Sequence, residues 1–356
     1  MHNDEQLSEE ALAGFRLTDP PPGFVDDPYP WYALLRRHSP VHQLGIKSYF
    51  LTRYEDVVAA YRDPRTSSDK KAEFTPKFGD SPLLEHHTTS LVFNDPPLHT
   101  RVRRLIMGAL NQRAIQQMEK GLIKLIDELL DDMEDLEAVD IIQDFAARIP
   151  IEVIGNLLDV PRDERQPLRG WSLAILSALE PAPEKSVLQA GNDAVVAFTD
   201  YLKLLVADRR RSPGDPASDV LTRLISEKED GEKLTETELL HNCIFLLNAG
   251  HETTTNLIGN GVHALMKHRD QLELLAAQPQ LADYAVEELL RYGEGGDIAH
   301  CPALVVLFEH LRSARDILRP LIGRLTALHR AYPLAQLAFR NRSQAGARRR
   351  SFLVRG

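Results

Sequence analysis

Apolar residues recur every three or four positions along most of the chain after Pro97, which is the spacing of helices that bury one face. The pattern is clearest in residues 122–133, 141–158, 194–210 and 219–225, with proline or glycine between these segments. Each of the four segments is therefore predicted to be helical.

Before Pro97 the pattern changes from one segment to the next. Residues 31–38 have helical spacing, residues 41–45 and 48–53 alternate apolar and polar positions, and residues 54–63 return to helical spacing. Alternation on both sides of a turn is typical of a hairpin. We therefore expect a short helix, a two-stranded hairpin and a second helix in this part of the chain.

The longest helical pattern covers residues 230–268. Thr235 is a suitable N-cap for this helix, and Glu238, three residues later, completes a capping box. Because the helix is apolar on most sides, it is expected to run through the centre of a domain. The predicted fold class is mainly α, with a small β-sheet built largely near the N-terminus.

Part of this helix, FLLNAGHETTTNLIGNG (residues 245–261), combines small, acidic and hydroxyl residues. Ala249 and Gly250 lack bulk, so a flat ligand or a small molecule can approach the helix backbone beside them. Glu252 and Thr253 offer an acid and a hydroxyl that can pass protons to a molecule bound there. The same residues also fit a buried helix that packs closely and bonds its threonine hydroxyls to the preceding turn.

Two further pairs of residues have helical spacing. His99 and Arg103 stand four apart, where they can either clamp a carboxylate or simply face solvent. Glu288 and Arg291 stand three apart and by themselves form an ordinary exposed ion pair, worth about 0.3 kcal/mol. Each pair taken alone is a weak indication of function.

In their order and spacing, these elements resemble the cytochrome P450 family of haem-thiolate monooxygenases, particularly its soluble bacterial members. The resemblance extends over most of residues 28–292. It includes SYFLTRYEDVVAAYRDPRTSS (residues 48–68), the His-x-x-x-Arg pair, the Ala-Gly-x-Glu-Thr run and the Glu-x-x-Arg pair. It implies a cytochrome P450-like helical fold with a small β-sheet and haem as the cofactor. The C-terminal part departs from the family and is expected to be atypical or incomplete.

The resemblance also implies roles for the cofactor-binding residues. By similarity to the family, His99 and Arg103 would bind the haem propionates. Ala249 and Gly250 would open the groove beside the iron.

Catalytic and structural roles follow from the same resemblance. Glu252 and Thr253 would manage protons during dioxygen cleavage, whereas Glu288 and Arg291 would brace the fold. The implied reaction is the oxidation of a small organic substrate with dioxygen. Its two electrons would come from a ferredoxin or flavoprotein donor.

The family's iron ligand, a cysteine thiolate in a glycine-rich loop, has no counterpart in this sequence. Cys301 follows Arg291 by only ten residues, and its neighbours do not reproduce the loop. Cys243 precedes the residues of the oxygen groove and is expected to pack as a small apolar residue. We therefore assign neither cysteine as the axial ligand, and the sequence predicts no metal ligand.

Composition narrows the class of protein further. With 43% hydrophobic and 26% charged residues, the chain is predicted to be globular. Two cysteines are too few for a disulfide framework or a structural zinc site. The net charge of −10 argues against nucleic acid as a partner. Without a signal-peptide pattern or an apolar run near the ~20 residues of a membrane helix, we expect a cytoplasmic protein with no transmembrane segment.

Charge and composition change sharply near Tyr292. Up to that residue the chain has 31 Lys and Arg beside 48 Asp and Glu, whereas residues 293–356 have 11 arginines, no lysine and 4 acidic residues. We therefore divide the chain into a lead-in (residues 1–27), a truncated cytochrome P450-like domain (residues 28–292) and an atypical Arg-rich tail (residues 293–356).

Three explanations of the tail stay open. A reading-frame change or rearrangement near residue 292 accounts for the loss of lysine, the excess of arginine and the lost family pattern. A functional basic helix fits the spacing of several leucines, Leu304 and Leu307 among them, with arginines available to bind an anionic surface. The third explanation is a lineage-specific ending that packs onto the core.

The absent ligand loop leads us to expect an unstable or haem-poor product whose monooxygenase activity is impaired. The alternative function is that of a non-catalytic, decayed relative, or of a helical protein that binds a ligand without thiolate haem.

Overall fold

The computed structural model describes residues 9–25, 27–46, 48–110, 112–134, 138–180, 183–216, 219–226, 233–293 and 305–307. These residues form two compact units, the first ending at Ser68 and the second beginning at Asp69. The division of the chain into residues 1–27, 28–292 and 293–356 stays a prediction.

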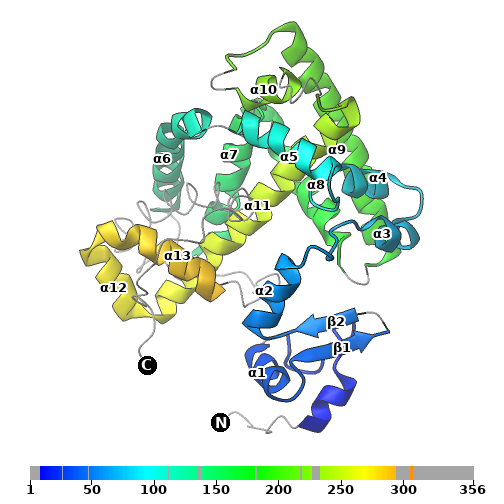
Figure 1. Ribbon diagram of the computed structural model, residues 1–356. Helices are drawn as coiled ribbons and strands as arrows, with labels where there is room; N and C mark the ends of the chain where they lie inside the picture. The colour runs from blue at the N-terminus through cyan, green and yellow to red at the C-terminus, as the bar shows by residue number, and fades with distance from the viewer. Residues whose placement is uncertain are drawn as a thin grey trace. The chain divides into compact units, whose positions relative to one another are not determined.

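The first unit combines helices with one hairpin (Figure 1). Its elements are the 3-10 helix η1 (Glu9–Gly14), α1 (Tyr29–His38), β1 (Val41–Gly45), β2 (Ser48–Leu51) and α2 (Tyr54–Arg62). Strands β1 and β2 are antiparallel, with Val41 opposite Leu51. The helices and the hairpin predicted for this part of the chain are confirmed.

A small aromatic core holds the first unit together. Phe15 and Leu35 are fully buried, and Trp31 is nearly so. The ring of Phe15 lies 6.0 Å from that of Trp31 and 6.1 Å from that of Phe50 on β2. The hairpin is therefore joined to α1 by ring contacts, which add to the stabilisation from buried apolar area.

The second unit is almost wholly helical, as the period of its apolar residues predicts. Its α-helices are α3 (Lys71–Phe78), α4 (Pro82–Thr89), α5 (Leu98–Ala109), α6 (Gln112–Glu134), α7 (Arg148–Leu157), α8 (Gln166–Ser177), α9 (Lys185–Arg211), α10 (Val220–Ser226), α11 (Glu236–Lys267), α12 (Arg269–Ala277) and α13 (Ala282–Gly293). In the described part of the chain, none of the helices is long and apolar enough to cross a membrane.

Helix α11 runs through the middle of this unit and packs against α4, α7, α8, α9, α12 and α13 (Figure 1). The predicted capping box starts it: the Glu238 amide donates to Thr235 Oγ1 at 3.2 Å, and the Thr235 amide donates to Glu238 Oε2 at 2.8 Å. The prediction of a central, capped helix is confirmed.

The apolar spacing of residues 141–158 predicted one continuous helix, but the structure divides this segment into two helices. Ile141–Ala146 form a π-helix (η2), and α7 begins only at Arg148. The amide of Ala147 donates to the carbonyl of Ile142, five residues earlier, at 2.9 Å. Pro150 has no N–H to donate to the carbonyl four residues before it, so a regular helix cannot pass through this point.

Two large hydrophobic clusters fill the second unit, and α11 contributes to both. Its N-terminal half contributes Leu239, Leu240, Cys243, Ile244, Leu246 and Leu247 to the first cluster. Its C-terminal half contributes Leu257, Ile258, Val262 and Leu265 to the second. The residues between Leu247 and Leu257 therefore lie where one cluster ends and the next begins.

In the Arg-rich tail the structure describes Gly293 and residues 305–307. The other tail residues for which predictions were made lie outside the described residues. Val305–Leu307 form β4, which pairs antiparallel with β3 (Ala138–Asp140). The basic-helix explanation is therefore wrong for Leu307. Two β-branched valines in succession favour an extended backbone over a helix.

Candidate functional site

The residues that pointed to oxygen chemistry lie on two successive turns of α11, between its two clusters. Ala249, Gly250 and Glu252 are half-buried, and Thr253 is exposed. The helix thus presents a small residue, an acid and a hydroxyl within a short distance of one another.

Threonine hydroxyls in this stretch bond to the preceding turn. Thr253 Oγ1 donates to the carbonyl of Ala249 at 2.6 Å, and Thr255 Oγ1 donates to that of His251 at 2.9 Å. Because each hydroxyl donates its hydrogen bond to a backbone carbonyl, its oxygen can only accept hydrogen bonds from other groups.

Gly250 marks a close approach of two helices. A Cβ atom placed on Gly250 would lie 2.7 Å from Cδ1 and 3.2 Å from Cγ1 of Ile154 on α7. The absence of a side chain at residue 250 therefore lets α7 pack closely on α11, and Ile154 occupies the room beside it.

His251, which follows Gly250, is almost completely buried. Neither of its ring nitrogens hydrogen-bonds to another described residue. Burial, with a smaller effect of Arg169, lowers the pKa of His251 to about 4, so the ring is neutral at pH 7.

His99 and Arg103 lie four residues apart on α5, as predicted, and both are half-buried. Their helix is tied to α11 through Arg101, which stands between them. Arg101 Nη1 donates to Glu238 Oε2 at 3.2 Å, and its Nη2 donates to Glu238 Oε1. This link is not predictable from the sequence, since nothing in the local spacing connects residues 137 positions apart.

Glu288 and Arg291 form an ion pair on α13, which packs against α11. Arg291 Nε donates to Glu288 Oε2 at 2.8 Å, and its Nη2 donates to Oε1. These bonds raise the pKa of the guanidinium, whose side chain is 58% exposed. The structure therefore brings this predicted pair together, on a different helix from Glu252 and Thr253.

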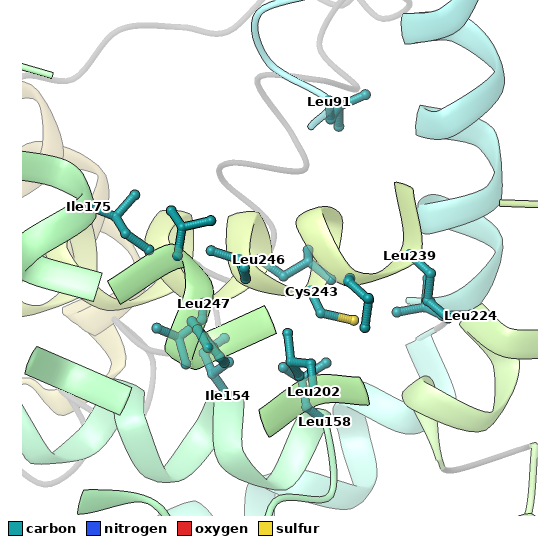
Figure 2. Close-up of a cluster of buried hydrophobic side chains, with 14 of the residues drawn as sticks. Leu91, Ile154, Leu158, Ile175, Leu202, Leu224, Leu239, Cys243, Leu246 and Leu247 are labelled. Atoms are coloured by element: carbon teal, nitrogen blue, oxygen red, sulfur yellow. The ribbon is translucent and has the colours of Figure 1, made fainter. Parts of the chain in front are cut away.

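Cys243 is fully buried among leucine and isoleucine side chains from several helices (Figure 2). Burial raises the pKa of its thiol to about 12. The prediction that Cys243 packs as a small apolar residue is confirmed, and among the described residues burial alone accounts for the raised pKa of the thiol.

Comparison with known proteins gives the family. A family profile described as Cytochrome P450 matches residues 173–276. Over 299 residues the chain is 35% identical to a protein of Bacillus subtilis (strain 168) named Cytochrome P450. The aligned region covers 82% of this chain and 71% of that protein. This chain belongs to the cytochrome P450 family. The predicted resemblance is confirmed.

Other cytochrome P450 proteins support the same assignment. The Vitamin D(3) 25-hydroxylase of Pseudonocardia autotrophica is 38% identical over 273 residues, which are 76% of this chain and 65% of that protein. A crystal structure of P450BioI in complex with an acyl carrier protein aligns with a TM-score of 0.70 at 26% identity, covering 87% of this chain and 92% of that one. The predicted mainly α, cytochrome P450-like fold is confirmed.

Cytochrome P450 proteins bind haem, so we compared the described residues with the needs of that group. His99 and Arg103 of α5 are of the kinds that suit propionates, and Ala249, Glu252 and Thr253 are of the kinds that suit the oxygen side. The iron ligand does not fit: Cys243 is enclosed in the apolar cluster, and Cys301 lies outside the described residues. The described residues therefore include groups of the kinds that suit propionates and dioxygen, but no cysteine that suits the iron.

Proposed function

We propose that this chain derives from an enzyme that oxidises a small organic substrate with dioxygen, using haem and two electrons from a ferredoxin or flavoprotein. The placement of the Ala-Gly-x-Glu-Thr run on the central helix carries the proposal. The relative from Pseudonocardia autotrophica is named a hydroxylase, which supports hydroxylation as the type of oxidation.

In this proposal haem, when bound, supplies the iron at which dioxygen is reduced. His99 and Arg103 hold its propionates, because a cationic or donor group every four residues on one helix suits a carboxylate. Ala249 leaves room for a small molecule beside the helix. Gly250 contributes by letting α7 approach, which positions this part of α11.

Glu252 and Thr253 handle protons in this proposal. Thr253 Oγ1 donates to the Ala249 carbonyl, so it must turn away from that carbonyl before it can give a proton to a molecule in the site. The half-buried carboxyl of Glu252, one residue earlier, is the group that replaces the proton.

We also propose that the chain as it stands is impaired at the step that requires a thiolate. The burial of Cys243 in an apolar cluster is the observation that carries this part. A thiol that ionises only near pH 12 is not a thiolate at neutral pH, and moving it to a ligand position would open the first hydrophobic cluster.

The test is an absorption spectrum of the purified full chain, supplemented with haem, reduced and exposed to carbon monoxide. We expect little bound haem and no red-shifted Soret band of a thiolate ligand. Stoichiometric haem with that band would contradict the impairment.

Two variants identify the ligand if the thiolate band is present. Loss of the band in Cys301→Ala, with the band retained in Cys243→Ala, would assign Cys301 to the iron and overturn our assignment of neither cysteine. Absence of any haem binding in the wild-type chain, after supplementation, would instead overturn the haem-dependent function for this chain.

A further inference from the structure

Three buried histidines from two helices meet in the second unit, apart from the residues considered above. His86 and His87 lie on α4, and His241 lies on α11. The ring of His86 is 4.9 Å from that of His87 and 5.4 Å from that of His241. Their relative exposures are 2%, 3% and 4%. Histidine is seldom buried so completely, and three in contact need a physical account.

The surroundings of the histidine cluster favour neutral rings. His87 lies 5.6 Å from the ring of Phe74, 5.4 Å from Phe78 and 5.7 Å from Phe93. Each histidine also has a buried ring nitrogen without a hydrogen-bond partner in the described residues: Nδ1 of His86, Nε2 of His87 and Nδ1 of His241. A proton added to such a nitrogen would create a buried cation with no acceptor.

Charged groups near the cluster do not offset such a cation. On α3, the amine of Lys77 donates to the carbonyls of Leu179 and Glu180, and its charge opposes protonation of His87. On α11, the Glu238 carboxylate is held by Arg101. On α9, Asn192 accepts a hydrogen bond from the Leu83 amide and is uncharged, and Glu85 of α4 is exposed.

Burial lowers the pKa of His87 and of His241 to about 4, and that of His86 well below its ordinary value. In the folded chain the three rings are therefore neutral at pH 7. In water, each would be protonated below pH 6.5.

Helix α4 is attached at its two ends by amide side chains. The backbone N–H of Leu83 donates to Oδ1 of Asn192 on α9 at 3.0 Å. The N–H of Leu91, just after the helix, donates to Oδ1 of Asn242 on α11 at 3.0 Å. His86 and His87 lie between these attachments. Protonation of their rings would therefore weaken the packing of α4 on α11 between its two attached ends.

We propose that His86, His87 and His241 form a proton-operated latch that holds α4, together with α3 packed on it, against α11 at neutral pH and releases both helices on acidification. Helices α3 and α4 have eight residues each, so opening them exposes far less apolar surface than unfolding the unit. Opening lets all three rings take up protons in water, and this uptake drives release as the pH falls. The proposal does not depend on haem binding or on the proposed function.

Hydrogen–deuterium exchange of the full chain at pH 7.5 and pH 5.0, read by mass spectrometry and corrected for intrinsic rates, tests the latch. We expect peptides from residues 71–91 to lose at least tenfold in protection at pH 5.0. At pH 5.0, peptides from residues 254–265 of α11 should stay at least tenfold better protected than those from residues 71–91, because their exchange requires the whole unit to unfold. Unchanged protection of residues 71–91, or equal protection of the two regions at pH 5.0, would overturn the proposal.

Variants separate the histidine cluster from other acid effects. The double variant His87→Phe, His241→Leu removes two of the three titrating rings, and we expect the loss of protection in its residues 71–91 to be at least threefold smaller than in the wild-type chain. His251→Leu removes a buried histidine outside the cluster and should keep the tenfold loss. The same loss in the double variant as in the wild-type chain would also overturn the proposal. If the double variant does not fold, the regional comparison in the wild-type chain decides.

Discussion

At the scale of single residues, Arg165 is a buried cation whose donors are all used. Its side chain is 7% exposed. Its Nε and Nη2 donate to the carbonyl of Val160 at 2.9 and 2.7 Å, its Nη1 to Glu152 Oε2 at 2.9 Å, and its Nη2 also to Asn156 Oδ1 at 2.9 Å. A Cβ on Gly155 would overlap this side chain, so the glycine makes room for it. Arg165 thus joins α7 to the turn that precedes α8.

We expect Arg165→Ala to lower the free energy of unfolding by roughly 3–5 kcal/mol, because it removes the buried partner of Glu152 and leaves the Val160 carbonyl without its donor. Arg162→Ala is the matched control. Arg162 pairs with the same carboxylate at 3.3 Å but is 67% exposed, so its loss should cost less than about 1 kcal/mol. Urea unfolding of the three proteins gives the comparison. Equal losses of unfolding free energy in the two variants would show that the burial of Arg165 does not determine how much it stabilises the fold.

At the scale of elements, α11 depends on glycines where other elements approach it. A Cβ on Gly259 would overlap Cδ1 of Ile142 in η2, just as one on Gly250 would crowd Ile154 of α7. Gly121 on α6 has nothing within 4 Å of the same position. The same residue type therefore serves packing in α11 and only weakens the helix in α6.

We expect Gly259→Ala to destabilise the chain by about 1 kcal/mol, because an overpacking penalty of ~1–3 kcal/mol exceeds the ~1 kcal/mol gain in helix propensity. Gly121→Ala gains helix propensity without any overpacking, so it should stabilise the chain by about 0.5–1 kcal/mol. The measurement is the midpoint of urea unfolding at constant slope.

A second substitution tests the cause. Ile142→Val removes the overlapping Cδ1, so in the Gly259→Ala background it should restore about 1 kcal/mol relative to the sum of the single effects. Strict additivity of the two substitutions would rule out the contact between Ile142 and residue 259 as the reason.

At the scale of the whole molecule, stability depends on keeping several histidines uncharged. Burial lowers the pKa of His87, His241 and His251 from 6.5 to about 4. The unfolded chain therefore takes up protons below pH 6.5 that the folded chain takes up only near pH 4. Between these values unfolding absorbs protons, so stability is lost as the pH falls.

We expect the free energy of unfolding to decrease between pH 6.5 and pH 4.5 by roughly 1.4 kcal/mol per pH unit for each of these histidines. Urea unfolding at several pH values gives the slope of the free energy of unfolding against pH. His251→Leu should reduce this slope by about 1.4 kcal/mol per pH unit, the contribution of one histidine. A flat profile over this range would contradict the neutral, buried state of the rings.

The sequence by itself determined the class of fold and the family. Apolar periodicity and the capping box of Thr235 predicted the long central helix, and alternation predicted the hairpin of β1 and β2. The spacing of His99 with Arg103 and the run from Ala249 to Thr253 led to the family. These features are local, since each depends on residues within a few positions of one another, and so they can be found without knowledge of the fold.

Tertiary structure alone decided which distant residues meet. It joined His241 to a histidine pair more than 150 positions earlier, tied Arg101 to Glu238 and set Gly250 against Ile154. It also broke the segment 141–158 into a π-helix and a shorter α-helix. These outcomes depend on packing between elements, and the side chains that lie opposite one another across a contact leave no mark in the period of either element's own sequence.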